Sequence, residues 1–83
     1  MKSEEQKKID KVMSEVESEY KKAVMLHPGF RSPHEGLGIL WEEFEELKAE
    51  VFKNERRRNR ILMSREAKQV AAMAIRFMID CGE

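Results

Sequence analysis

Residues 32–51 of the chain read SPHEGLGILWEEFEELKAEV. The stretch opens with Ser32, Pro33 and Glu35, which are typical of an N-cap, a first helical position and a capping box. Behind this start, apolar residues recur at steps of three and four: Leu37, Leu40, Trp41, Phe44, Leu47 and Val51. This spacing predicts an amphipathic helix over residues 33–54, and the rest of the fold is built around it.

Two further helices are predicted, over residues 9–27 and 64–81. The first carries one apolar stripe and ends at the Pro28-Gly29 pair, while the polar residues 1–8 are expected to fray. The third begins after a cap at Ser64 and is apolar on nearly all sides. Residues 54–60 contain no apolar side chain and are predicted to be an exposed connection. The expected fold is all-α, an antiparallel bundle of three helices forming a single domain over residues 1–83.

The size of the chain adds an expectation about assembly. With 83 residues and a single cysteine, Cys81, the chain has little surface to bury and no disulfide within the monomer to stabilise it. A small chain of only three helices does not easily bury one helix that is apolar on nearly all sides. We therefore expect a homo-oligomer, a dimer or a tetramer, in which a second subunit completes the bundle.

Composition and charge argue against several classes of protein. The 16 basic and 16 acidic residues cancel, whereas nucleic-acid-binding domains usually carry a basic excess. No apolar run approaches the ~20 residues of a membrane span, and the polar N-terminus does not resemble a signal peptide. The single thiol is typical of a reducing compartment. The expectation is a cytoplasmic protein without a membrane or nucleic-acid partner.

Four side chains are expected to meet between the second and third helices. At about 100° per residue, Glu43 and Glu46 lie on one flank of the second helix, and Glu66 and Gln69 lie at the same offset on the third. Clustered carboxylates stay ionised when a cation compensates them, and Mg²⁺ prefers oxygen ligands, with Mn²⁺ as the alternative ion. The other interpretation is a solvated helix face on which Glu pairs with Lys at four-residue spacing.

The same residues resemble the signature of the MazG-like all-α nucleoside triphosphate pyrophosphohydrolases, in which EExxE is followed, after a spacer, by ExxD. Glu42, Glu43 and Glu46 match the first half within WEEFEEL, and Glu66 matches the first position of the second half within REAKQVAAMA. The resemblance covers residues 32–81. It departs from the pattern at Gln69, where a neutral amide stands in place of an aspartate.

The resemblance implies an activity and an assembly. Members of the family use Mg²⁺ held between two helices to cleave a nucleoside triphosphate into the monophosphate and pyrophosphate, and they form dimers or tetramers. Glu42, or a neighbouring carboxylate, would assist the attacking water. A second function remains open because of Gln69: a catalytically weak or inactive helical oligomer that binds nucleotides or another protein.

Two other groups of side chains are candidates for ligand binding. Arg56, Arg57 and Arg60, together with Arg58, are expected to neutralise a triphosphate, or else to form a solvated charge run that keeps the connection soluble. Trp41 is a candidate for stacking on a nucleobase, although its place on the apolar stripe favours a role in the core.

Overall fold

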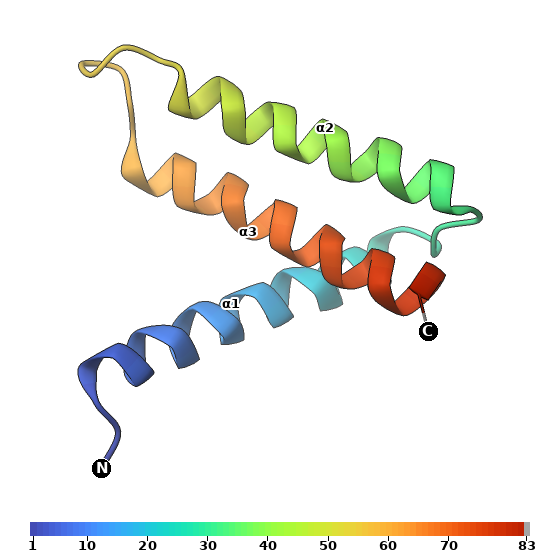
Figure 1. Ribbon diagram of the computed structural model, residues 1–83, viewed down its shortest axis with the longest axis horizontal. Coiled ribbons are helices and arrows are strands. Elements are labelled where there is room, and N and C mark those ends of the chain that lie inside the picture. The colour runs from blue at the N-terminus through green and yellow to red at the C-terminus, as the bar shows by residue number, and fades with distance from the viewer. Residues whose placement is uncertain (83) are drawn as a thin grey trace.

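The computed structural model describes residues 1–82 as three helices with short connections (Figure 1). Helix α1 spans Glu4–Leu26, α2 spans Pro33–Val51 and α3 spans Arg60–Phe77, and a π-helical turn, η1, continues α3 over Met78–Gly82. No strand occurs in this part of the chain, so the predicted all-α class is confirmed. No helix among the described residues is long and apolar enough to cross a membrane. Glu83, the last residue of the predicted domain, lies outside the described residues.

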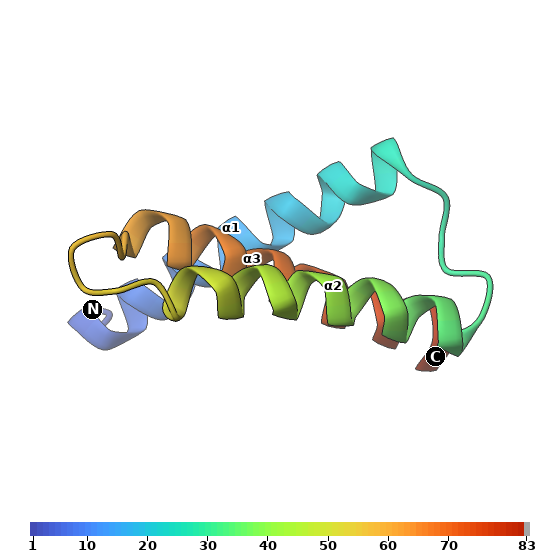
Figure 2. The same cartoon turned by 90° about the horizontal axis from the view of Figure 1, so that it is seen from above.

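The helix α3 lies between the other two. Helices α2 and α3 form an antiparallel hairpin, and α1 packs against α3 while scarcely touching α2. Figures 1 and 2 show that α1 runs in the same general direction as α3 and crosses it at an angle. The C-terminal end of α1 diverges from the hairpin before the chain turns back into α2 (Figure 2).

Side-chain caps explain where the helices begin. The Ser3 hydroxyl accepts a hydrogen bond from the Gln6 amide at 3.0 Å, and the Ser32 hydroxyl accepts one from the Glu35 amide at 3.1 Å. Each satisfies a backbone donor that the first turn of a helix leaves without an intrahelical partner. The predicted cap at Ser32, with Pro33 at the first helical position, is therefore confirmed.

The structure corrects several predicted boundaries. Residues 4–8 are helical rather than frayed, because Ser3 caps them, and α1 ends one residue earlier than predicted. Helix α2 ends at Val51 rather than at residue 54. Helix α3 begins four residues before Ser64, because Asn59 caps it by accepting hydrogen bonds from the amides of Ile61 and Leu62.

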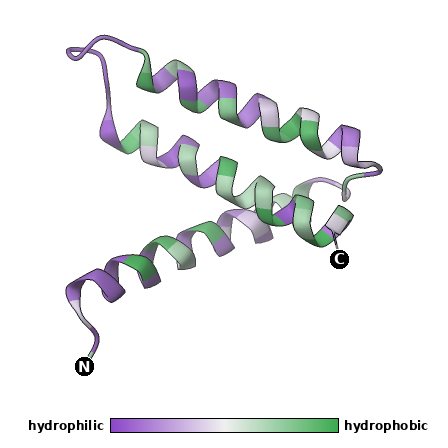
Figure 3. Cartoon of the chain, viewed as in Figure 1, coloured by the Kyte–Doolittle hydropathy of each residue, from purple (hydrophilic) through white to green (hydrophobic). Residues whose placement is uncertain are grey.

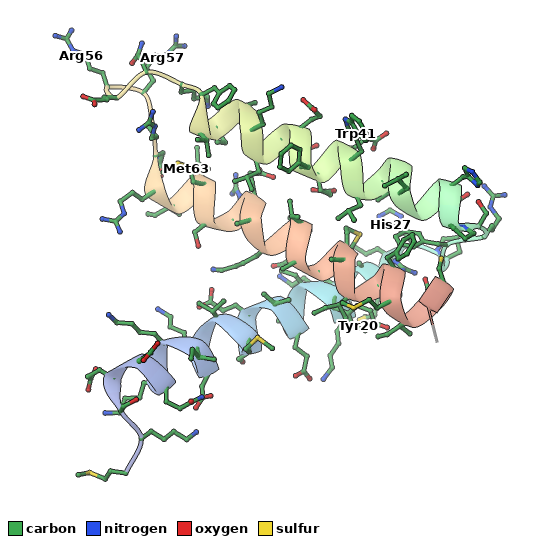
Figure 4. The ribbon with its side chains drawn as sticks, viewed as in Figure 1. Tyr20, His27, Trp41, Arg56, Arg57 and Met63 are labelled. Atoms are coloured by element: carbon green, nitrogen blue, oxygen red, sulfur yellow. The ribbon has the colours of Figure 1, made fainter. Side chains whose placement is uncertain are left out.

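The core is small and centred on α3. Among the described residues, the buried apolar side chains are Val16, Ala72 and Met73, and partly buried residues from all three helices pack around them, including Tyr20 where α1 crosses α3 (Figure 4). The apolar character of α3 on nearly all sides follows from its two neighbours within the chain, α1 and α2. It does not by itself require a second subunit, contrary to the reasoning from the sequence.

Many apolar side chains of α1 and α2 remain exposed. Figure 3 shows hydrophobic residues along all three helices, whereas the connection between α2 and α3 is hydrophilic. Trp41 is 62% exposed, so the expected place in the core of the chain is wrong. Its indole N–H donates a hydrogen bond to Glu45 on the same helix.

A buried arginine fastens the end of α1 to α3. The Arg76 guanidinium donates hydrogen bonds to the carbonyl oxygens of Ala23 at 3.0 Å and His27 at 2.7 Å, and to the Asp80 carboxylate at 3.3 Å. The same carboxylate accepts the backbone N–H of Phe30 at 3.0 Å. The last carbonyls of α1 and the connection that follows are thereby satisfied by side chains from α3 and η1.

Candidate metal centre

Three carboxylates converge between α2 and α3. Glu43 and Glu46 lie one turn apart on α2, and Glu66 lies on the facing side of α3, so the antiparallel hairpin brings the three side chains together. One oxygen from each carboxylate lies within 4.8 Å of the other two. The geometry expected from the helical spacing is present, while the metal-binding role of these residues stays a prediction.

These three carboxylates lack basic partners. Most other acidic side chains of α1 and α2 pair with a lysine or arginine, as Glu17 does with Lys21 and Glu50 with Lys53. Within residues 1–82, neither Glu43, Glu46 nor Glu66 forms an ion pair, unlike the Glu–Lys pairs of an ordinary solvated helix face.

The crowding of negative charge raises the pKa values of two of the three groups. The pKa of Glu43 is raised above its ordinary value by burial, and further by the charges of Glu46 and Glu66. Burial likewise raises the pKa of Glu66, followed by the charge of Glu46. Without a cation, Glu43 and Glu66 therefore keep their protons to a higher pH than an isolated glutamate does.

The donor set fits a small divalent cation. Mg²⁺ bonds to oxygen at about 2.1 Å in an octahedron, so neighbouring ligand oxygens lie about 3.0 Å apart and opposite ones about 4.2 Å apart. Three ligands of one ion include at least two neighbouring pairs, so carboxylate oxygens that lie up to 4.8 Å apart would have to draw closer to bind it. Three carboxylates leave further coordination positions for water or phosphate oxygens. Glu43, Glu46 and Glu66 thus offer the oxygen donors that Mg²⁺ or Mn²⁺ prefers, and the binding of either ion stays a prediction.

Gln69, the fourth predicted ligand, is engaged elsewhere through its amide nitrogen. Its Nε2 donates a hydrogen bond to Glu19 Oε2 of α1 at 2.7 Å. Within residues 1–82 no hydrogen bond involves the Gln69 amide oxygen, so its role as a metal ligand stays a prediction. Glu19 was missed at the sequence level because its partner is 50 residues away, and no local pattern reveals the crossing of α1 over α3.

A cavity of about 390 Å³ adjoins the carboxylate cluster and is walled by all three helices. Its apolar lining includes Ala23, Leu26, Phe30, Ile39 and Met73. Its polar lining consists of Glu19, Lys22, His27, Glu42, Glu43, Gln69 and Arg76. Glu43 belongs to both the cavity and the cluster, so a molecule in the cavity would reach an ion held by the carboxylates. The volume is within the range of small-molecule sites.

Glu42, the predicted helper for the attacking water, lies in the cavity wall beside Glu43. It is exposed, and it forms no ion pair with any described residue. Its position is consistent with contact to a bound ligand, while its catalytic role stays a prediction.

The arginines proposed for phosphate binding lie away from this cavity. Arg56 and Arg57 project from the tip of the connection between α2 and α3 (Figure 4), and neither they nor Arg60 line the cavity. Arg58 donates hydrogen bonds to the carbonyl oxygens of Val51 and Lys53, which closes the connection. The basic side chains that do line the cavity are Lys22 and Arg76, which the sequence did not single out.

Comparison with protein-family models, curated proteins and solved structures finds no match for this chain. The assignment of a function therefore depends on the cluster, the cavity and the sequence signature.

Proposed function

We propose that the chain is a Mg²⁺-dependent nucleoside triphosphate pyrophosphohydrolase of the MazG-like type. The observation that carries the proposal is the cluster of three carboxylates without basic partners, Glu43, Glu46 and Glu66, at the edge of a cavity that Glu43 also lines. The cluster supplies a cation site for phosphates, and the cavity supplies space for the rest of a nucleotide. The EExxE signature, followed by Glu66, supports the same conclusion.

In the proposed reaction, water attacks the α-phosphorus. The bond between this phosphorus and the oxygen that bridges to the β-phosphate breaks, which releases the monophosphate and pyrophosphate. Bound Mg²⁺ would withdraw electron density from the phosphate oxygens and orient water. Glu43, Glu46 and Glu66 would hold the ion. Glu42 faces the cavity next to Glu43 and is the proposed acceptor of the proton that the attacking water loses.

A pyrophosphate-release assay tests this proposal. The purified full chain would be given each common ribo- and deoxyribonucleoside triphosphate with Mg²⁺ or Mn²⁺. The wild type should release pyrophosphate. Glu43→Gln or Glu66→Gln should lower the rate about 100-fold or more, because loss of a metal ligand should reduce activity at least as much as loss of a residue that orients a ligand. Glu45→Gln is the matched control, since Glu45 is on α2 but contacts Trp41 and Lys48 instead. Equal rates in all variants, or no release with any triphosphate, would contradict the proposal.

A second function is favoured by one specific observation. The amide nitrogen of Gln69 is held by Glu19, and the cluster contains three carboxylates where the family pattern implies four acidic metal ligands. Such a site is suited to binding a nucleotide without turning it over. Nucleotide binding in the absence of pyrophosphate release would identify a binding module.

We also propose that two copies of the chain associate. The chain exposes 6749 Å², whereas a folded monomer of 9.8 kDa is expected to expose about 5,200 Å². The excess of roughly 1,600 Å² is what each subunit of an obligate dimer buries. An apolar groove of about 390 Å³ between α2 and α3 is the surface that fits a second copy, and it is lined by Leu37, Leu40, Trp41, Phe44, Glu45, Val70 and Ala74.

A further inference from the structure

A hydrogen-bonded pair of side chains in the cavity wall joins α1 to α3: Glu19 and Gln69. The Gln69 amide nitrogen lies 2.7 Å from Glu19 Oε2, and both side chains face the cavity. Phe30, Ile39 and Met73 supply apolar surface in the same space. The pair therefore places a polar recognition element in the same cavity as an apolar surface that suits a flat ring.

At this wall, the Glu19 carboxylate supplies mainly hydrogen-bond acceptors. A carboxylate only accepts, and Glu19 retains lone pairs beyond those used by Gln69 and by the Lys22 ammonium at 3.4 Å. The hydrogen bond from Gln69 lowers the pKa of Glu19, so this carboxylate is ionised at neutral pH. A matching ligand must present N–H donors, and two parallel donors would use both oxygens of the carboxylate.

We infer that Glu19, held in place by Gln69, selects a nucleobase that carries an amino group beside a ring N–H, which among the common bases is guanine. This inference rests on the proposed function in that a nucleotide occupies the cavity. Adenine and cytosine present an amino group beside a ring nitrogen that is an acceptor and would repel the carboxylate. Uracil and thymine flank their ring N–H with two carbonyl oxygens. Only guanine offers two adjacent donors to one carboxylate.

The position of Gln69 is explained by the same inference. An aspartate at this position would face the Glu19 carboxylate with a second negative charge, whereas the amide donates to it and fixes its orientation. Gln69 is therefore a positioning residue for Glu19. A purely structural bridge between α1 and α3 would also explain the hydrogen bond, but it would not discriminate between bases.

Guanosine and inosine separate these two explanations, because they differ only in the 2-amino group. Both nucleosides lack phosphates, so their affinities, measured by chemical-shift titration of the full chain without metal, do not depend on catalysis. A hydrogen bond to a charged group contributes about 1.5–3 kcal/mol, so the wild type should bind guanosine about tenfold or more tightly than inosine. Glu19→Gln should bring the two affinities close to equality, mainly by weakening guanosine. Glu19→Asp, which keeps the charge, should retain part of the preference.

Glu15→Gln is the matched control. Glu15 pairs with Lys68, so it also joins α1 to α3, but it does not line the cavity. The guanosine preference should survive in this variant. Equal affinity for both nucleosides in the wild type, no binding of either, or an unchanged preference in Glu19→Gln would overturn the inference. If no triphosphate is hydrolysed while guanosine is still preferred, the proposed activity fails and the inference stands.

Discussion

Glu43 is the residue that links the carboxylate cluster to the cavity, and its charge is opposed by two neighbours. Replacing it with glutamine removes one of three mutually repelling charges. In the metal-free protein, Glu43→Gln should therefore raise stability by roughly 0.5 kcal/mol, as for other like-charge pairs on helices. That corresponds to an increase in Tm of about 2–4 °C for a domain of this size.

The same substitution should have the opposite effect when a cation is present. Mn²⁺ or Mg²⁺ should raise the Tm of the wild type, because ligands that bind only the native state stabilise it. It should raise the Tm of Glu43→Gln much less. Thermal melts with and without millimolar Mn²⁺ measure the Tm of Glu43→Gln relative to the wild type in each condition, with Glu45→Gln as the control. Equal shifts in wild type and Glu43→Gln would show that Glu43 is not a ligand.

The raised pKa values of Glu43 and Glu66 predict how metal-free stability depends on pH. Well below the ordinary value of 4.5, both groups are protonated in the folded and unfolded states and contribute nothing. As the pH rises from 4.5 through the raised values, the folded state holds more protons than the unfolded state, so these groups make stability fall. Above that window their destabilising contribution is complete.

The double variant Glu43→Gln, Glu66→Gln isolates this contribution from the other carboxylates. Its stability relative to the wild type should increase as the pH rises from about 4 to 7 in EDTA, and urea denaturation at several pH values measures the difference. A constant difference across this range would mean that the pKa values of these two carboxylates are not raised in solution.

At the scale of the helical element, the two glycines of α2 have different surroundings. A Cβ atom on Gly36 would lie 2.8 Å from ring atoms of both Phe30 and Phe77, whereas one on Gly38 would meet nothing within 4 Å. Gly36→Ala should destabilise the chain by about 1–3 kcal/mol through overpacking. Gly38→Ala should stabilise it by about 1 kcal/mol through helix propensity. Urea denaturation of the two variants measures both effects, and equal shifts would contradict the packing of α2.

Arg76 determines how α1 is attached. Its guanidinium is buried and donates to two carbonyl oxygens of α1 and its C-cap, Ala23 and His27. Arg76→Met should destabilise the chain by about 2–4 kcal/mol, because it removes the buried cation that pairs with Asp80 and the donor of the His27 carbonyl oxygen. Arg57→Met, at the exposed tip of the connection, should change stability by less than about 0.5 kcal/mol. A similar small change for both would show that the attachment is not important for stability.

The helices and the carboxylate cluster were largely predictable, since both follow from local periodicity. Helical periodicity predicts the face of α2 that carries Glu43 and Glu46 and the face of α3 that carries Glu66. An antiparallel hairpin then brings these faces together. Features that depend on the crossing of α1 over α3 were not predictable. Arg76 looks like a solvent-facing residue in the sequence, because the carbonyls it binds are about 50 positions away.

The N-caps also show where prediction from the sequence is limited, here over only a few residues. Ser64 and Asn59 are both suitable N-cap residues, and because Asn59 belongs to the polar run 54–60 it was assigned to the connection rather than to the start of α3. The apolar character of α3 was recognised, but the sequence alone did not show how much of it α1 and α2 account for by packing against α3.

At the scale of the whole molecule, the exposed groove between α2 and α3 predicts a dimer. Sedimentation equilibrium at micromolar concentration should give twice the mass of the chain. Phe44→Glu should produce monomers, because it places a charge in the apolar groove. Phe52→Glu is the control: Phe52 is 75% exposed and does not line the groove. A monomeric wild type, or two variants that behave alike, would exclude this surface as the interface.

The central place of α3 also sets the order in which the chain assembles. The hairpin closes a short connection, so its contacts join segments that are close in sequence, whereas α1 must find partners on α3 about 50 residues away. Closing the longer loop costs more chain entropy, and α1 has no surface to pack on until α3 is formed. We therefore expect α1 to dock last during folding and to detach first during partial unfolding. Its amide hydrogens should exchange with solvent through a local opening that leaves the hairpin intact.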